Sequence, residues 1–484
     1  MTKISNHLAI DLGAESGRAI VGTLDNGVLS LMETHRFPNN PLNASDGLHW
    51  DVNTLWSEIQ VGIKKSADRF PLSSLAVDTW GVDFALLDEN GNLLENPFHY
   101  RDSRTDGMME KAFSRVSREK IFSDTGIQFM QINTLFQLLA MVENRSPHLS
   151  VAATFLTISD LFNYWLTHSI SCEFTNATTT QCFDPSTRSW AMPLLESMKI
   201  PTKIFPPICE PGSVLGNLNP EVAIETGAGN IPVIAPACHD TGSALVAVPA
   251  EGRDFVWLSS GTWSIMGIEA DSPCLNQQAL DFNFTNEGGV FGTWRLSKNI
   301  MGLWLIQECK REWGISYEEI TKLAAEAKPF LAVIDPDDAI FLHSGAICKK
   351  IQGYCENSKQ KIPQTKGEIS RIILEGLSLK YRFVLERLEQ LAKKKLGPIH
   401  IIGGGTKNYL LNQFTADSTD RLVISGPIEA TAIGNILMQA ITLRKLSNLE
   451  EARTVVKNSF PPTIIQPNNT PEWNEAYSRF LNIL

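Results

Sequence analysis

The sequence predicts a mixed α/β protein with two domains, and three observations lead to this prediction. The chain has 484 residues, more than one hydrophobic core usually supports. One hairpin pattern occurs near the N-terminus and again near the middle of the chain. A long helical pattern in the second half is followed directly by a buried strand and a run of glycines, which is typical of alternating helices and strands.

The repeated hairpin is the first element in chain order. An apolar strand over Leu8–Asp11 leads into a tight turn at Gly13, and a second apolar strand follows over Arg18–Thr23. The same order of strand, turn and strand returns over residues 255–268, with Gly261 in the turn. The two turns lie half a chain length apart, which favours two related domains, although hairpins also recur by chance.

Two further apolar segments lie inside the first half of the chain. Residues 75–78 and 82–87 precede the polar turn 88–92, and they predict a pair of strands closed by that turn. A domain boundary is expected near residues 245–252, before the second hairpin.

The second half begins with the repeated hairpin and then turns helical. Residues 369–391 carry apolar side chains at helical spacing and end in lysines, so we expect one long amphipathic helix. Ile399–Ile402 is then a buried strand, and Gly403–Gly405 permits close backbone approach. The predicted domains are residues 1–248 and 249–484, with a ligand cleft between them.

Composition and charge exclude several classes of protein. The net charge is −11 and no basic run exceeds Lys393–Lys395, so we expect no nucleic-acid partner. The eight cysteines form no C-x-x-C pair, which argues against a zinc site and for reduced thiols. The N-terminal apolar stretch already contains Asp11, so it resembles neither a signal peptide nor a membrane span, and we expect a cytoplasmic protein with no membrane partner.

Both hairpin turns have the chemistry of phosphate-binding loops. Asp11–Arg18 places an acid at a strand end, where it can hold Mg²⁺ through water, and then turn amides that can cradle phosphate oxygens. The turn at residues 259–262 supplies hydroxyl groups and a glycine for the other side of the same polyphosphate, and closure of two such turns would exclude water. A plain hairpin turn is the alternative for each.

A candidate catalytic acid follows another apolar run. Asp240 comes after the strand predicted at Ile231–Ala235, where a carboxylate can accept the proton of an attacking hydroxyl group. The alternative for an Asp before Thr-Gly-Ser is helix N-capping. Trp50 and Trp80 are candidates for stacking on a sugar, with burial in the core as the alternative.

The glycines at residues 403–408 could lay their backbone against an adenine ring. The spacing G-x-G-x-x-G of a dinucleotide fingerprint is absent, and so is the P-loop pattern G-x-x-x-x-G-K-[ST]. An ordinary strand and turn is the alternative.

Taken in order, these motifs resemble those of the FGGY carbohydrate kinases, over nearly the whole chain. The matching segments are a first phosphate motif at 11–18, a second at 255–267, an adenosine motif at 403–408 and the following helix at 430–440. Blocks such as VDTWGVDFALLD at 77–88 and ACHDTGSA at 237–244 look like the branch that phosphorylates L-rhamnulose. The resemblance implies an α/β fold of two actin-like, ribonuclease H-like domains, with ATP and a ketose in the cleft between them.

The resemblance also implies roles for individual residues. Asp240 resembles the catalytic base, and Asp11 resembles the acid associated with Mg²⁺. The positions that match the family's sugar contacts are Gly81, His239, Asp240, Thr241 and Asn299. The positions that match its ATP contacts are Ala14, Glu15, Ser16, Gly17, Arg18, Thr262, Gln307 and Gly404.

One position departs from the pattern. Where the family's first turn commonly carries a small hydroxyl residue, this chain has Glu15. A carboxylate aimed at the γ-phosphate would be repelled, so we expect Glu15 to face away or to meet a cation.

The implied reaction transfers the γ-phosphoryl group of ATP to the 1-hydroxyl of L-rhamnulose, with Mg²⁺ as cofactor and a homodimer as the family expectation. A kinase for L-fuculose, L-ribulose or D-xylulose is the first alternative, because few side chains separate these sugars. An actin-like ATPase that uses ATP as a switch, without phosphoryl transfer to a sugar, is the second.

Overall fold

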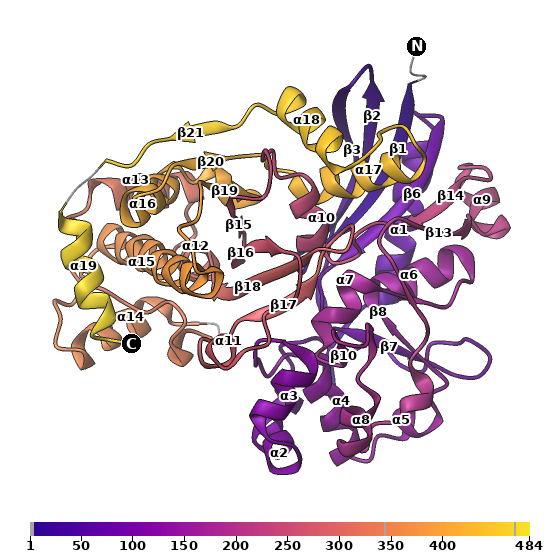
Figure 1. Ribbon diagram of the computed structural model, residues 1–484, viewed down its shortest axis with the longest axis horizontal. Helices are drawn as coiled ribbons and strands as arrows, with labels where there is room; N and C mark the ends of the chain where they lie inside the picture. The colour runs from indigo at the N-terminus through magenta and orange to yellow at the C-terminus, as the bar shows by residue number, and fades with distance from the viewer. Residues whose placement is uncertain (1–3, 343–344, 469–470) are drawn as a thin grey trace. The chain divides into compact units, whose positions relative to one another are not determined.

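The computed structural model describes residues 4–342, 345–468 and 471–484, and the chain folds into two compact units (Figure 1). Unit 1 consists of the described parts of Met1–Ala247, Glu269–Leu296 and Ala430–Ser459. Unit 2 consists of the described parts of Val248–Ile268, Ser297–Glu429 and Phe460–Leu484. Each unit therefore combines segments that are distant in sequence, whereas the predicted domains 1–248 and 249–484 are contiguous.

A six-stranded sheet forms the centre of unit 1. Its strand order is β13 (Ser213–Asn217), β14 (Pro232–Ala235), β6 (Leu72–Thr79), β1 (Ser5–Leu12), β2 (Ser16–Asp25) and β3 (Val28–Pro38). β1 pairs antiparallel with β2, which confirms the predicted first hairpin, and it pairs parallel with β6. Every residue of β1 is buried, because helices cover the sheet.

The helix at Ala430–Thr442, α17, comes from the C-terminal half and packs on this sheet, and a second helix from that half, at Leu449–Ser459, contacts β3. α17 contacts β1 and β6, and Figure 1 shows it lying beside them. It also packs against α10 (Asp240–Val246) so closely that a Cβ atom at Gly434 would lie 1.8 Å from the carbonyl oxygen of Ser243. The apolar face of α17 is therefore buried within unit 1, which explains why unit 1 includes this distant segment.

Unit 1 also contains further helices and four small sheets. Its other helices are α1 (Val52–Ala67), α2 (Met108–Arg115), α3 (Arg118–Thr125), α4 (Thr134–Glu143), α5 (Pro147–Val151), α6 (Ile158–Thr167), α7 (Phe174–Ala177), α8 (Met192–Ser197), α9 (Pro220–Thr226), α11 (Gln277–Asp281) and α18 (Leu449–Ser459). Four two-stranded sheets pair β4 (Pro41–Ala44) with β5 (Gly47–Trp50), β7 (Phe84–Leu87) with β8 (Thr154–Thr157), β9 (Cys172–Glu173) with β12 (Ile208–Cys209), and β10 (Phe183–Asp184) with β11 (Ser189–Trp190).

The strand pair predicted over 75–78 and 82–87 does not form. Both segments contain strands, but β6 pairs with β1 and β14, and β7 pairs with β8. The prediction was wrong because neighbours in sequence need not be neighbours in a sheet.

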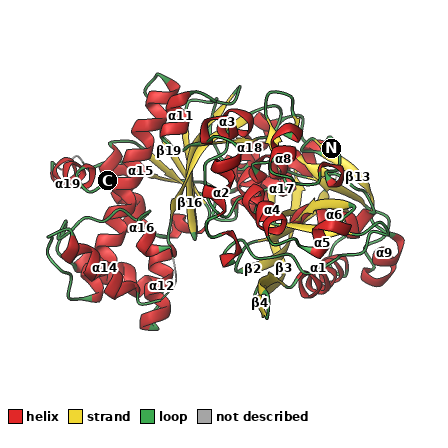
Figure 2. Cartoon of the chain, turned by 90° about the horizontal axis from the view of Figure 1, so that it is seen from below, coloured by secondary structure: helices red, strands yellow, loops and turns green. Residues whose placement is uncertain are grey.

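A seven-stranded sheet has the order β17 (Thr285–Gly288), β18 (Trp294–Met301), β16 (Trp263–Ala270), β15 (Val256–Ser260), β19 (Ile399–Ile402), β20 (Val423–Ser425) and β21 (Thr463–Ile465). β15 and β16 are antiparallel, which confirms the second hairpin, and β19 lies parallel to β15 as a fully buried strand. The helices of unit 2 are α12 (Trp304–Trp313), α13 (Tyr317–Glu326), α14 (Ile347–Asn357), α15 (Lys366–Ala392), α16 (Tyr409–Thr419) and α19 (Glu472–Leu481). Figure 2 shows the strands gathered in each unit with helices around them.

The predicted long helix is α15. Thr365 and Glu368 form a capping box at its start, since each side chain accepts a hydrogen bond from the other residue's backbone N–H. Lys393, in the left-handed region, ends the helix. The apolar residues that recur at helical spacing over 369–391 are buried, as predicted.

The described cysteines are free thiols, five of them buried, as expected for a chain without disulfide bonds. Within the part of the chain that the structure describes, no helix has the length and apolar character needed to span a bilayer.

Candidate active site

The first hairpin brings charged side chains together near the end of β1. In the register of the sheet, Asp11 lies opposite Arg18 on β2 and opposite Asp78 on β6. The Arg18 guanidinium donates to Oδ2 of Asp11. A carboxylate and a cation therefore lie side by side where phosphate and metal binding were predicted.

The turn of this hairpin is tied down by Asn39. The Gly13 N–H donates to the Ser16 carbonyl oxygen at 3.0 Å, which closes the turn. The Asn39 side chain donates to the Gly13 carbonyl at 2.9 Å, and its backbone N–H donates to the Glu15 carbonyl at 3.0 Å. The Glu15 side chain is exposed, and no ion pair holds it within the described chain.

Asp78 is a buried carboxyl group beside Asp11. Its Oδ2 accepts a hydrogen bond from Nδ2 of Asn435 at 2.6 Å, and its Oδ1 has no hydrogen-bond partner among the described residues. Burial, and then the charge of Asp11, raise the pKa of Asp78 well above its ordinary value. Asp78 is thus an acid that favours its protonated form unless a cation approaches.

The two carboxyl groups, Asp11 and Asp78, are suited to Mg²⁺ that shares its ligands with water and phosphate. In residues 4–342, 345–468 and 471–484, no group of three or more His, Cys, Asp or Glu side chains could hold a metal ion by itself. Mg²⁺ commonly binds one or two carboxylates and completes its octahedral shell with waters and phosphate oxygens. Asp11 and Asp78 lie on neighbouring strands, and Oδ1 of Asp78 has no hydrogen-bond partner among the described residues, so the two carboxyl groups are a donor set of this kind.

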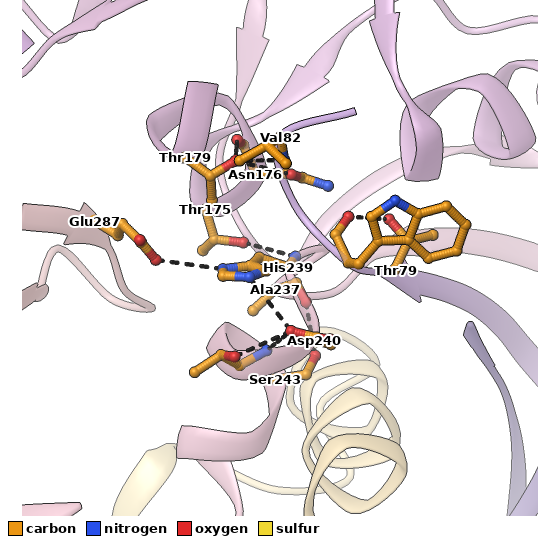
Figure 3. Close-up of polar contacts among 12 residues, drawn as sticks. Thr79, Val82, Thr175, Asn176, Thr179, Ala237, His239, Asp240, Ser243 and Glu287 are labelled. Carbon is orange, nitrogen blue, oxygen red and sulfur yellow. Dashed lines mark hydrogen bonds and ion pairs between the residues drawn. The ribbon is translucent and has the colours of Figure 1, made fainter. Parts of the chain in front are cut away.

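The loop before α10 is fixed by a buried glutamate. Glu173 accepts hydrogen bonds from the Cys238 N–H at 3.0 Å and from Oγ1 of Thr175 at 2.6 Å. The same Thr175 hydroxyl accepts from the His239 N–H at 3.2 Å, as Figure 3 shows. Burial raises the pKa of Glu173 to about 8, although these donors lower it in part. This network fixes the backbone that carries Asp240.

Asp240 is the first residue of α10, and its side chain is one-third exposed, at 33%. Its Oδ1 accepts from the backbone N–H of Thr241 and from Oγ1 of Thr241 at 3.0 Å. The N-cap of α10 is His239, and Asp240 follows it, with its Oδ1 on an N–H of the first turn of the helix. Asp240 is an acceptor held at a helix start, close enough to Asp78 to act on it electrostatically.

His239 lies between two carboxylates (Figure 3). Its Nε2 is 3.3 Å from Oδ1 of Asp240, and its Nδ1 is 3.4 Å from Oε2 of Glu287 on β17. Arg295 on β18 also approaches Nδ1, at 3.0 Å. Burial opposes ionisation of Glu287, but the charge of Arg295 is the largest opposing influence, and the pKa of Glu287 is lowered to about 2.

Gly81 lies in the loop after β6, against Thr179. A Cβ atom at Gly81 would lie 2.9 Å from Oγ1 of Thr179. That hydroxyl donates to the Asn176 carbonyl at 2.8 Å and accepts from the Val82 N–H at 3.1 Å. A side chain at position 81 would therefore disturb the loop.

Trp50 and Trp80 are core residues, 0% and 6% exposed. Their indole N–H groups both donate to Oδ2 of Asp83, at 2.6 and 3.0 Å. The core interpretation of these tryptophans is therefore correct, because their rings are not available to stack on a sugar.

In unit 2, two predicted ATP contacts meet. Gln307 on α12 donates from Nε2 to Oγ1 of Thr262, in the turn between β15 and β16, at 2.9 Å. The start of α12 is bound to the same turn, since the Trp304 N–H donates to the Thr262 carbonyl at 3.1 Å. Asn299 lies in the middle of β18 and is partly buried.

The glycine-rich turn adjoins this hairpin. A Cβ atom at Gly405 would lie 2.0 Å from Oγ of Ser260, whereas one at Gly404 would meet nothing within 4 Å. Gly404 is exposed. Thr262, Gln307 and the glycines thus gather around one end of β15.

The sequence did not reveal the roles of several residues of these networks. Glu173, Glu287 and Arg295 lie outside the quoted motifs, and Asp78 lies in the block 77–88 but was not singled out. The available signal was local: a buried arginine stands between the apolar Trp294 and Leu296 of β18, where an apolar residue is usual.

Comparison with known proteins identifies the family. The model of the FGGY family of carbohydrate kinases matches residues 7–247 with its N-terminal domain and residues 256–443 with its C-terminal domain. A protein of Bacteroides thetaiotaomicron named rhamnulokinase is 43% identical over 479 residues, which covers 99% of both chains. A rhamnulokinase of Oceanobacillus iheyensis is 43% identical over 457 residues, 94% of this chain and 97% of its own.

Solved structures share the fold. A ligand-bound xylulose kinase from Lactobacillus acidophilus matches with a TM-score of 0.83 at 16% identity, over 99% of this chain and 97% of that chain. A gluconate kinase from the same organism matches with a TM-score of 0.82 at 16% identity, over 99% and 98%. The predicted α/β fold with two actin-like, ribonuclease H-like domains is confirmed. Because both halves match the family model and relatives align over almost the full length, the chain belongs to the FGGY family of carbohydrate kinases.

Proposed function

We propose that this kinase transfers the γ-phosphoryl group of ATP to the 1-hydroxyl of L-rhamnulose, giving L-rhamnulose 1-phosphate and ADP. The observation that carries the proposal is the shared name of its relatives: proteins named rhamnulokinase are 38–43% identical to it over 94–99% of the chain. A partly exposed carboxylate at the start of α10, beside a buried histidine, supports the same reaction.

In the proposed reaction, Asp240 accepts the proton of the 1-hydroxyl while that oxygen attacks the γ-phosphorus. The bond from phosphorus to the bridging oxygen of ADP breaks as the new one forms. Gly81, His239, Thr241 and Asn299 would bind the sugar. Proton transfer to a positioned carboxylate contributes about 10²–10⁴-fold to the rate.

The phosphates of ATP would be bound by turn amides and by Arg18, which can donate to a phosphate oxygen as it does to Asp11. Ala14, Glu15, Ser16, Gly17, Thr262, Gln307 and Gly404 complete the proposed ATP contacts. Mg²⁺ bound with ATP would neutralise phosphate charge, and Asp11 and Asp78 are the residues that would hold it. Cytoplasmic location and a homodimer are part of the proposal by family expectation.

A coupled ADP-release assay tests the proposal. Mg·ATP is supplied with equal concentrations of L-rhamnulose, L-fuculose, L-ribulose, D-xylulose or glycerol. We expect the highest kcat/KM with L-rhamnulose. A preference for another ketose would keep the mechanism and change the substrate, and ADP release that no sugar stimulates would favour the ATPase switch.

A further inference from the structure

We propose that Glu287 and Arg295 are positioning residues for the transfer step. Together they hold His239 with its Nε2–H directed at Oδ1 of Asp240, which leaves Oδ2 of Asp240 to take the proton of the sugar hydroxyl. The inference rests on the proposed function, because it assigns Asp240 the role of base.

The contacts of His239 define its hydrogen-bonding state. Nη2 of Arg295 lies 3.0 Å from Nδ1 of His239, closer than Oε2 of Glu287 at 3.4 Å. A guanidinium group only donates, so the shorter contact favours a lone pair on Nδ1, with the ring proton on Nε2, over an Nδ1–H that donates to Glu287. Nε2 is the nitrogen that faces Oδ1 of Asp240, at 3.3 Å (Figure 3).

Glu287 keeps Arg295 in place. Its Oε2 lies 3.0 Å from Nη2 of Arg295, and its Oε1 accepts from Oγ1 of Thr285 at 3.4 Å. Arg295 is further tied by its Nε, which donates to the Gly288 carbonyl at 2.8 Å. Because Glu287 and the Gly288 carbonyl hold the guanidinium group at two points, the orientation of Nη2 toward His239 is fixed.

The two carboxylate oxygens of Asp240 have different hydrogen-bond partners. Oδ1 accepts from the backbone and the hydroxyl of Thr241 and from His239. Within the described chain, no hydrogen bond or ion pair involves Oδ2. The most basic position of the carboxylate is therefore the oxygen that carries no donor, and the donors on Oδ1 prevent the group from rotating.

Stability alone does not account for this buried pair. Arg295 is 1% exposed and Glu287 6%. Nη1 of Arg295 has no hydrogen-bond partner among the described residues. A buried ion pair that leaves a donor unsatisfied is commonly no more stabilising than apolar residues of the same volume. The pair contacts His239, the residue next to Asp240, and we therefore assign the pair a role in positioning His239.

The test uses three variants of the full chain: Glu287→Gln, Arg295→Met, and the double variant Glu287→Leu/Arg295→Met, which replaces the pair by apolar volume. We expect kcat for the ketose to fall about 10–100-fold while KM for ATP changes less than about threefold, because His239 is a proposed sugar contact and neither residue of the pair is a proposed ATP contact. Glu269→Gln is the matched control, since it removes the acid from another buried pair of unit 1, with Arg453. It should leave kcat unchanged.

A double-mutant cycle separates positioning from general loosening. If Glu287 and Arg295 act through His239, then Arg295→Met should cost little further rate in a chain that already carries His239→Gln. If Arg295→Met lowers kcat by the same factor with and without His239→Gln, the proposal is overturned. A normal kcat in folded Glu287→Gln and Arg295→Met would also overturn it.

The position of the ring proton on His239 can be measured by NMR, independently of enzyme activity. In ¹⁵N-histidine-labelled protein, the signals absent from His239→Gln belong to His239. We expect a protonated Nε2 and an unprotonated Nδ1, and the reverse assignment would overturn the proposal even if the Glu287 and Arg295 variants fail to fold. Failure of the proposed function is a separate outcome, seen as wild-type protein that no ketose stimulates.

Discussion

Gly405 approaches Ser260 so closely that a Cβ atom on Gly405 would lie 2.0 Å from the Ser260 hydroxyl oxygen. This contact joins the glycine-rich turn after β19 to the end of β15, where the second hairpin turns. The preceding residue, Gly404, is exposed and has open space around its Cβ position. Packing therefore explains the glycine at position 405, whereas no described neighbour restricts the side chain at position 404.

Alanine at these two positions separates folding from ATP binding. We expect Gly405→Ala to lower the free energy of unfolding by about 1–3 kcal/mol, because Ser260 must shift to admit the methyl group. Gly404→Ala should change it by less than about 0.5 kcal/mol and should raise KM for ATP. Urea unfolding and steady-state kinetics on both variants provide the check; an unaltered KM for ATP in Gly404→Ala would remove Gly404 from the nucleotide site.

Replacing Asp240 by Asn tests the base directly. The amide cannot take the proton of the sugar hydroxyl, so kcat should fall by about 10²–10⁴-fold with the fold intact. Asp281→Asn, at an exposed acid of unit 1, should keep full activity. Near-normal turnover by folded Asp240→Asn would contradict the assignment, and circular dichroism establishes that both variants are folded.

The sequence predicted those parts of the molecule whose cause is local. Both hairpins and α15 were predicted because turn glycines and helical periodicity act over a few residues. The pairing expected between 75–78 and 82–87 was wrong because the partners of β6 come from β1 and β14. Strand partners are a tertiary property that no short window contains.

The same distinction holds for the site. Asp11, Asp240 and the turn glycines stand in motifs, so their chemistry could be predicted before their surroundings were known. Glu287 and Arg295 matter only because β17 and β18 bring them to His239, about fifty residues away in sequence. No sequence spacing predicts such a contact, and the one indication in the sequence is an arginine between two apolar residues.

Glu15 offers a test of the unusual first turn. Its carboxylate is exposed in the turn proposed to bind phosphate. We expect Glu15→Ser to lower KM for ATP by about two- to fivefold at low salt, because repulsion of the phosphates is removed, and the effect should shrink as salt rises. Asp25→Ser, at the exposed end of β2, should change nothing. An unchanged KM for ATP in Glu15→Ser would mean that this side chain does not face the nucleotide.

Asp83 gives a pH dependence whose sign follows from its burial. Burial raises the pKa of Asp83 from 3.8 to about 6, although Gln137, Trp50 and Trp80 donate hydrogen bonds that lower it in part. The folded chain therefore binds this proton more tightly than the unfolded chain does. The stability that it contributes is fully present below pH 3.8 and is lost as pH rises through about 6.

Asp83→Asn removes that titration and keeps an acceptor for the two indoles. Relative to Asp83→Asn, the wild-type chain should lose about 2 kcal/mol of unfolding free energy between about pH 4.5 and pH 7. Urea unfolding at several pH values measures the difference. Glu89→Gln, in the exposed turn after β7, is the control and should run parallel to wild type. A difference between wild type and Asp83→Asn that stays constant with pH would show that the two indoles and Gln137 hold Asp83 ionised throughout, so that hydrogen bonding outweighs burial at this carboxyl group.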